Sequence, residues 1–213
     1  MKTLICALFL LTFYQSNGQT VHECSANYSE KYKKIELERV TYKITQKNAD
    51  SLHMILDNEF HQCIIGKTMG NYSMVGKTGN IYTPESLHGK VVLFNFWTVN
   101  CGPCIAEVPM LNRLTTLYKE NNDFVLISVL LNDQDALDKL VERGSIRGDI
   151  RYEVIPNSKT LVKQNFGYAR HYPMPTNLFV DKTGKVYMRT VGGIQDQKGL
   201  EKIRSIIDSE LTK

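Results

Sequence analysis

The chain has 213 residues, of which 42% are hydrophobic and 23% are charged, and it carries a formal net charge of +4. A chain of this length and composition can bury a core, which excludes an intrinsically disordered protein. The charge is too small to indicate nucleic-acid binding, because the basic residues are spread along the chain and no aromatic-basic motif accompanies them.

The first 18 residues have the pattern of a secretory signal peptide. Lys2 is followed by an apolar run over residues 4–13 and by polar residues at 15–18, as such signals require. The run is shorter than the roughly 20 residues that span a bilayer, so we expect cleavage rather than a retained membrane anchor. Cleavage before or after Gln19 fits equally well. We therefore predict a periplasmic, or otherwise extracytoplasmic, protein whose signal peptide is residues 1–18.

Residues 19–63 form an N-terminal extension that we expect to be a small α+β unit. Alternation of apolar and polar residues over 40–44 predicts a short strand, and the spacing of apolar residues over 52–63 predicts a helix. Cys63 lies on the apolar side of that helix and is either a buried thiol or the disulfide partner of Cys24. Loss of Cys6 with the signal leaves four cysteines, an even number that suits disulfides in an oxidising compartment. Both possibilities stay open.

Cys101 and Cys104 belong to a Cys-Gly-Pro-Cys motif that follows a strand. The apolar run over residues 91–96 predicts this strand, and Pro103 favours the start of a helix directly after it. A sulfur at a helix N-terminus faces free N–H groups and the positive end of the helix dipole, which favour the thiolate. We therefore expect Cys101 to be the nucleophile and Cys104 the resolving cysteine of a redox-active disulfide.

A structural zinc site is the alternative explanation of a Cys-x-x-Cys motif. Zinc requires two further cysteine or histidine ligands, usually as a second closely spaced pair. The sequence contains no such pair, since Cys24 and Cys63 are far apart and His88 and His171 are single residues in different segments. We therefore expect no metal.

The remainder of the chain alternates between predicted helices and strands. The spacing of apolar residues predicts helices over residues 103–120, 135–143 and 200–211, and apolar runs predict strands over residues 124–130, 178–180 and 186–190. Gly192 and Gly193 are interpreted as a turn, because the wider glycine pattern of a nucleotide site is missing. This alternation predicts an α/β fold, with strands buried on both faces of a sheet.

Three segments occur in an order and spacing that match one protein family. They are residues 89–97, the Cys101–Cys104 motif followed by Glu107 and Pro109, and residues 175–181. Through them the chain from about residue 64 to its end resembles the TlpA/ResA-like thioredoxin-fold family, the extracytoplasmic thiol-disulfide oxidoreductases of bacteria. The resemblance implies that residues 64–213 form one thioredoxin-like domain, in which helices flank a central mixed β-sheet.

The resemblance also assigns residues near the redox motif. Pro175 matches the cis-proline that lies against the active disulfide, and the backbone of Met174 before it would pair with the substrate chain. Glu107 lies three residues after Cys104 and projects from the same helix face. It matches a family glutamate that modulates proton transfer, and our hypothesis is that it acts as the general base that deprotonates Cys104.

Two asparagines depart from the patterns of related proteins. Asn95 lies six residues before the first cysteine, where ordinary thioredoxin carries a buried aspartate, so Glu107 becomes the substitute proton acceptor. Asn100 replaces the tryptophan that often precedes the first cysteine, which leaves the specific protein substrate open. His171 and Tyr172, near Pro175, could shift the redox potential by charge or hydrogen bonding.

Two other classes of function compete with a reductase. By resemblance, a peroxiredoxin-like peroxidase would carry a threonine three residues and a proline seven residues before its reactive cysteine. Thr98 fits the first place, but Phe94 occupies the second. A noncatalytic binding domain whose disulfide is only a staple would need neither Glu107 nor Pro175.

We therefore predict a thiol-disulfide oxidoreductase, an enzyme that reduces protein disulfides rather than forms them. The Gly-Pro between the cysteines and the family resemblance favour this direction, and they make the thiols of apocytochrome c candidate substrates in cytochrome c maturation. Electrons would arrive from a membrane partner. The expected partners are protein thiols and disulfides and not nucleic acid, and the protein is expected to act as a monomer without a cofactor.

Overall fold

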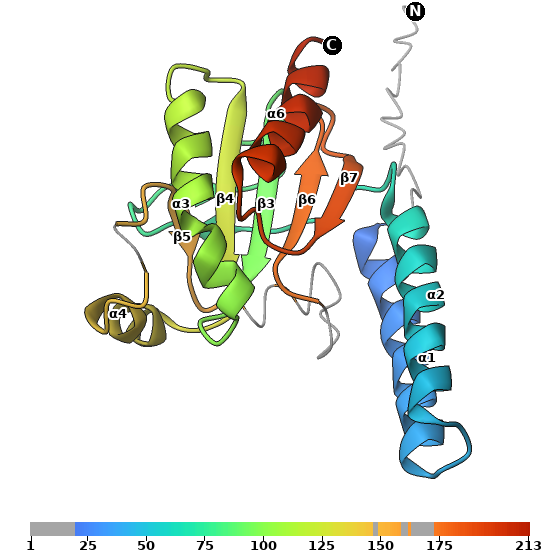
Figure 1. The fold of residues 1–213 in the computed structure, drawn as a ribbon. Helices are drawn as coiled ribbons and strands as arrows, with labels where there is room; N and C mark the ends of the chain where they lie inside the picture. The colour runs from blue at the N-terminus through green and yellow to red at the C-terminus, as the bar shows by residue number, and fades with distance from the viewer. Residues whose placement is uncertain (1–19, 147–148, 159–161, 163–172) are drawn as a thin grey trace, which may run out of the picture.

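The computed structural model describes residues 20–146, 149–158, 162 and 173–213 (Figure 1). A helical hairpin at the N-terminal end of these residues is followed by a sheet with helices against it. No helix within the described ranges is long and apolar enough to cross a membrane. The predicted signal peptide over residues 1–18, and also His171 and Tyr172, lie outside the described residues.

Five strands form one mixed sheet, which confirms the predicted α/β class. They are β3 (Val91–Trp97), β4 (Phe124–Leu130), β5 (Glu153–Ile155), β6 (Thr176–Val180) and β7 (Val186–Val191). Their order is β5-β4-β3-β6-β7, and β3 is parallel to β4 but antiparallel to β6. The other elements that the described residues of this region form are the helices α3 (Gly102–Leu117), α4 (Gln134–Glu142) and α6 (Gln197–Leu211) and the paired strands β1 (Met74–Val75) and β2 (Ile81–Tyr82).

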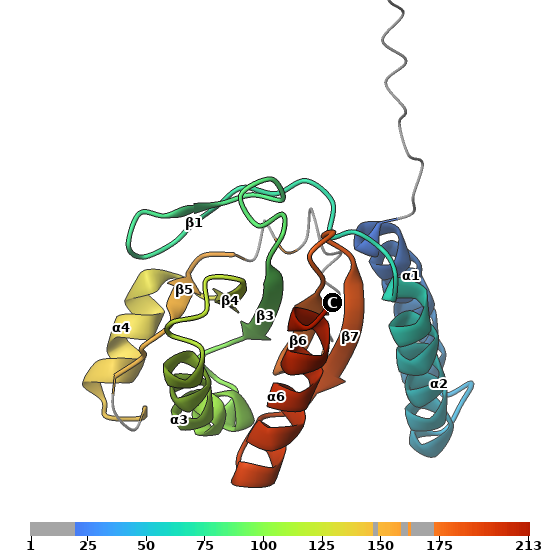
Figure 2. The ribbon, with the colours of Figure 1, turned by 90° about the horizontal axis from the view of Figure 1, so that it is seen from above.

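Alternate residues of the central strand β3 point into two different layers. Val91 and Leu93 pack with apolar side chains of α3 and α6 on one face, whereas Val92 and Phe94 pack with residues from the β1 region on the other. Figure 2 shows α3 and α6 on one side of the sheet and the β1 segment on the opposite side. Cover on both faces explains why every residue of β3 is buried.

Most predicted elements occur close to their expected bounds. The strand expected over residues 124–130 is β4 with the same limits, and the helix expected over 103–120 is α3, which ends at Leu117. The helix expected over 135–143 is α4. The sequence pattern does not predict β1, β2 and β5, because strands of two or three residues are too short to show a period.

The N-terminal extension is helical, so the expected α+β unit is wrong. α1 (Val21–Val40) and α2 (Gln46–Ile64) form a hairpin. Of the strand expected over residues 40–44, Val40 is the last residue of α1 and residues 41–44 belong to the turn between the helices. The alternation in that segment does not reflect burial, because Val40 is 55% exposed and Tyr42 is 94% exposed. The buried residues of α1 all lie within its first eight positions, so the helix has no long apolar stripe from which to predict it.

Cys24 and Cys63 form a disulfide that joins the first turn of α1 to the last turn of α2. Of the two possibilities for Cys63, the structure therefore selects the disulfide. The bond links residues separated by 39 positions in the sequence. On the chain-entropy model, a loop of this length contributes about 4 kcal/mol to the free energy of unfolding.

The hairpin lies beside the edge strand β7 (Figure 1), and a buried guanidinium joins the two. The side chain of Arg189 is 2% exposed and donates two hydrogen bonds to the Asp57 carboxylate of α2, at 2.7 and 3.1 Å. The same guanidinium lies 5.3 Å from the ring centre of Phe60, within the range of a cation–π interaction. These contacts attach the extension to the sheet.

We expect Asp57→Ala to lower the free energy of unfolding by about 2 kcal/mol, because the buried guanidinium of Arg189 loses its carboxylate partner. Glu59→Ala is the matched control on the same helix. Glu59 pairs with Lys31, and these side chains are 52% and 50% exposed, so the loss should stay below about 1 kcal/mol. Urea unfolding measures the free energy of unfolding of both variants. Equal losses would show that the buried pair of Asp57 and Arg189 stabilises the protein no more than an exposed ion pair does.

Candidate active site

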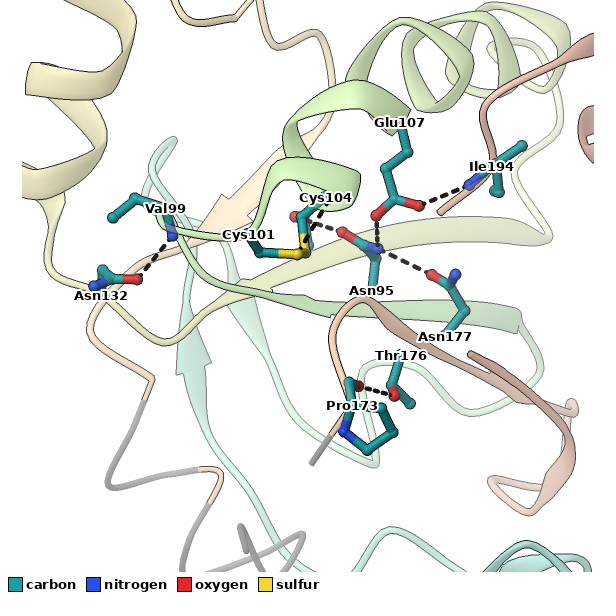
Figure 3. The surroundings of a disulfide bond; sticks show 11 residues. Asn95, Val99, Cys101, Cys104, Glu107, Asn132, Pro173, Thr176, Asn177 and Ile194 are labelled. Carbon is teal, nitrogen blue, oxygen red and sulfur yellow. Dashed lines mark hydrogen bonds between the residues drawn. A yellow bond between two sulfur atoms is a disulfide. The ribbon is translucent and has the colours of Figure 1, made fainter. Parts of the chain in front are cut away.

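Cys101 and Cys104 lie where β3 ends and α3 begins, and their sulfurs form a disulfide (Figure 3). Cys101 is the N-cap of α3, and its Sγ accepts a hydrogen bond from the backbone N–H of Cys104 at 3.2 Å. Pro103 lies in the first turn, where its missing N–H costs nothing. Because the N-terminus of a helix favours negative charge, this position favours the thiolate of Cys101 when the disulfide is reduced.

The two sulfurs differ in access. Cys101 is half-buried, whereas Cys104 is 1% exposed and packs in an apolar cluster with Trp97 and Val108. Cys101 is therefore the more accessible of the two cysteines, while Cys104 is covered by the protein. This difference suits a sequence in which Cys101 reacts with the substrate and Cys104 then attacks the bond that forms.

Met174 and Pro175 directly precede β6, with a cis peptide bond between them. The side chain of Met174 packs against the apolar cluster that holds Trp97 and Cys104 and that Cys101 also contacts. The carbonyl of Pro175 accepts a hydrogen bond from the N–H of Gly192 at 2.9 Å. The chain after β7 is thereby tied to the same region as the redox motif.

Glu107 is buried within α3, with 1% of its surface exposed. Its Oε1 accepts a hydrogen bond from Nδ2 of Asn95 at 2.8 Å, and its Oε2 accepts one from the backbone N–H of Ile194 at 3.1 Å (Figure 3). Burial raises the pKa of Glu107 from 4.5 to about 7, although both hydrogen bonds act in the opposite direction. A carboxyl with such a pKa can accept or release a proton at neutral pH.

The sequence patterns do not predict the partners of Glu107. Asn95 stands out only as a departure from thioredoxin, whereas its hydrogen bonds to Glu107 and to Asn177 of β6 follow from the fold. Ser128 of β4 donates to Oδ1 of Asn95 at 3.1 Å. The one available signal is that each of these residues interrupts an otherwise largely apolar strand, since a polar residue in a buried strand requires a partner.

Gly193 allows the chain after β7 to approach the start of α3. A Cβ at this position would lie 2.6 Å from the backbone carbonyl oxygen of Pro103. Gly193→Ala should therefore push the 192–194 segment away from α3 and lower the free energy of unfolding by about 1 to 3 kcal/mol. Gly102→Ala is the control, because a Cβ there meets no atom within 4 Å. Equal unfolding curves in urea for the two variants would contradict this close approach.

The surroundings of the Cys-Gly-Pro-Cys motif can be compared with what a zinc site and a peroxidase would require. Within the described ranges, no group of three or more His, Cys, Asp or Glu side chains could hold a metal ion. Phe94, at the place where a peroxidase would carry proline, is fully buried and packs edge-on against Tyr72, with 5.9 Å between the ring centres. These two rings belong to the core on the face of the sheet opposite α3.

Comparison with known proteins places the redox region in a family. The model of the AhpC/TSA family matches residues 65–189. The thiol-disulfide oxidoreductase ResA of a Bacillus cereus strain is 29% identical over 128 residues, which are 60% of this chain and 70% of that protein. ResA of Geobacillus kaustophilus is 25% identical over 138 residues, which are 65% of this chain and 75% of the relative.

Solved structures share the fold. A Chlorobium tepidum protein assigned as a thiol:disulfide interchange protein DsbE superposes with a TM-score of 0.56 and 25% identity, over 69% of this chain and 97% of that one. The exposed lipoprotein thioredoxin Etrx1 of Streptococcus pneumoniae gives a TM-score of 0.52 and 20% identity, over 66% and 99% of the two chains. The five-stranded sheet with its helices is therefore a thioredoxin-like fold, as predicted.

Proposed function

The chain belongs to the AhpC/TSA family, as a thiol-disulfide oxidoreductase of the ResA-like thioredoxin fold, and on that premise we propose that it reduces protein disulfides outside the cytoplasm. Cys101 is the nucleophile and Cys104 the resolving cysteine. The observation that carries the proposal is the disulfide between a half-buried Cys101 at a helix N-terminus and a fully buried Cys104. The disulfide is the oxidised end of the proposed cycle.

The reductive cycle starts from the dithiol. The Cys101 thiolate attacks one sulfur of the substrate disulfide, and the other substrate sulfur leaves as a thiolate that takes up a proton. Glu107 then accepts the proton of the Cys104 thiol, and the Cys104 thiolate attacks Sγ of Cys101. The second substrate sulfur leaves as a thiolate that takes up a proton, and the Cys101–Cys104 bond forms, so two electrons pass from the enzyme to the substrate.

Met174 and Pro175 are proposed to receive the substrate. Met174 packs in the same apolar cluster as Cys104, with Cys101 in contact with it, and we place the substrate chain against the backbone that precedes Pro175. An extended segment that contains a cysteine fits such a position. The cysteines of apocytochrome c are one candidate substrate of this kind, and reduction would then serve cytochrome c maturation.

The proposed organisation follows the order of the chain. Residues 1–18 are a cleaved signal peptide, residues 19–63 are an extension, which contains the hairpin, and residues 64–213 are the redox domain. The enzyme acts in the periplasm, or otherwise outside the cytoplasm, as a monomer. Each reduced substrate leaves the Cys101–Cys104 pair oxidised, so the pair needs a donor of electrons. We propose that this donor is a membrane protein.

A redox titration of the mature protein tests the direction of the reaction. Trp97 is 2% exposed and packs in the same apolar cluster as Cys104, so its fluorescence should report the state of the pair in graded thiol and disulfide buffers, with Cys101→Ser as the blank. A transition below about −220 mV supports a reductase, and one above about −180 mV makes the protein an oxidase or isomerase. Absence of any transition that depends on Cys101 would overturn the redox function.

A further inference from the structure

Three polar side chains lie next to one another across the sheet, under the helix that carries Glu107. Asn95 of β3 is in register with Ser128 of β4 on one side and with Asn177 of β6 on the other. Each of the three is at most 1% exposed. We name them the polar row. Buried polar groups are costly unless they are hydrogen-bonded, and an apolar side chain at each position would fit such strands better, so the row calls for an explanation.

The hydrogen bonds of the polar row converge on the amide of Asn95. Its Oδ1 accepts from the Ser128 hydroxyl at 3.1 Å. Its Nδ2 donates to Oδ1 of Asn177 at 3.0 Å and to Oε1 of Glu107 at 2.8 Å (Figure 3). Both amide hydrogens and the carbonyl oxygen of Asn95 are therefore engaged, and its donor end faces the carboxylate.

The two outer members of the row hold the Asn95 amide in place, with its donor end toward Glu107. If the amide of Asn95 turned over while that of Asn177 kept its orientation, the Asn95 oxygen would face the oxygen of Asn177 and the ionised carboxylate of Glu107 together. Two such contacts between acceptors are unfavourable in a buried site. The Ser128 hydroxyl donates to Oδ1 and so engages the opposite end of the Asn95 amide. Ser128 and Asn177 thus act on Glu107 only through Asn95.

We propose that Ser128 and Asn177 are positioning residues, which hold the Asn95 amide with its donor toward Glu107 so that this carboxylate can take the proton of Cys104. The inference rests on the proposed function of Glu107 and deepens it. It adds residues from β4 and β6, far from the Cys-Gly-Pro-Cys motif in sequence, to the resolution step.

The groups around Glu107 determine in which direction its pKa changes when the hydrogen bond from Asn95 is weakened. Burial raises the pKa of Glu107, while the hydrogen bonds from Asn95 and from the backbone of Ile194 lower it. Among the described residues, the titratable groups near Glu107 are the thiol of Cys104, three residues earlier on α3, and the phenol of Tyr152, whose pKa is raised by burial and then by Glu107. Loss of the Asn95 donor should raise the pKa of Glu107, because the hydrogen bond from Asn95 lowers it. The phenol of Tyr152 is neutral at pH 7 and does not offset this change.

The test follows the two thiols separately. One equivalent of dithiobis-nitrobenzoate is mixed with enzyme whose Cys101–Cys104 pair is reduced. Attack by Cys101 releases a first coloured thiolate, and attack by Cys104 on the mixed disulfide releases a second. In Ser128→Ala and Asn177→Ala we expect the pH midpoint of the second phase to rise by about one unit, the effect of weakening one charge-assisted hydrogen bond. The pH profile of the first phase should be unchanged.

Ser158→Ala is the matched control. It also removes a buried hydroxyl, which donates to the carbonyl of Ile155 at 2.8 Å and lies outside the polar row. An unshifted second phase in both row variants, or an equal shift in Ser158→Ala, would overturn the inference. Failure of the wild-type protein to release a second thiolate would instead refute the resolving function of Cys104, so the two outcomes are distinguishable.

A measurement on the wild-type protein covers the case in which the row variants do not fold. Carbon NMR of the Glu107 carboxyl and nitrogen NMR of the Asn95 amide are followed over the same pH range. The inference requires both signals to change with one midpoint, because the Asn95 amide donates to the carboxyl group whose charge changes. An Asn95 amide signal that does not respond to the titration of Glu107 would contradict it.

Discussion

Cys101→Ser is expected to abolish turnover of a protein disulfide, with a loss of at least about a thousandfold, because a serine hydroxyl does not replace the thiolate that starts the exchange. Cys104→Ser should behave differently. Cys101 remains half-buried at the helix N-terminus and can still attack, but the mixed disulfide cannot be resolved. This variant should therefore accumulate as a covalent complex with its substrate, visible by mass spectrometry or non-reducing electrophoresis.

The control for this first pair of variants is the double substitution Cys24→Ser with Cys63→Ser. It removes a disulfide of the same chain that joins α1 to α2, away from the redox motif. Its turnover should match that of the wild type at a temperature where it is folded. If Cys104→Ser formed no mixed disulfide while Cys101→Ser did, the order of attack would be the reverse of the one proposed.

Glu107→Gln is expected to slow the resolution step by about a hundredfold at neutral pH, as the loss of a general base typically does. In the wild type the rate of this step should rise with pH as Glu107 ionises, with an inflection close to pH 7. The glutamine variant should lose that inflection. Stopped-flow measurement of the second thiolate released from dithiobis-nitrobenzoate gives both values, and an unchanged pH profile would exclude Glu107 from proton transfer.

The same substitution should change how stability depends on pH. A carboxyl whose pKa rises from 4.5 in the unfolded chain to about 7 in the folded one favours the folded state only while it is protonated. That stabilisation is complete below pH 4.5 and is lost as the pH rises to 7, by about 3 kcal/mol. Urea unfolding of the oxidised protein at pH 5 and pH 8 should show this loss in the wild type but not in Glu107→Gln.

Several parts of the fold could be predicted from the sequence because their signals are local. The run Val91–Trp97 is almost entirely apolar, and Pro103 marks the start of a helix shortly after it. An apolar run was enough to predict β4, and the helical spacing of apolar residues was enough to predict α3 and α4 within a few positions. The strand expected over residues 40–44 was wrong, because these five alternating residues form the exposed end of α1 and the turn after it, and their pattern carries no information on burial.

By itself the sequence determined the thiol chemistry, because a pair of cysteines three residues apart after a buried strand is close in any helix that begins there. Tertiary structure alone decided the environment of Glu107. Its partner Asn95 is 12 residues away and the N–H of Ile194 is 87 residues away, while Asn95 is linked to Asn177 over 82 residues. Such contacts depend on strand order and register, which no local period encodes, and the pKa of a buried carboxyl depends on them.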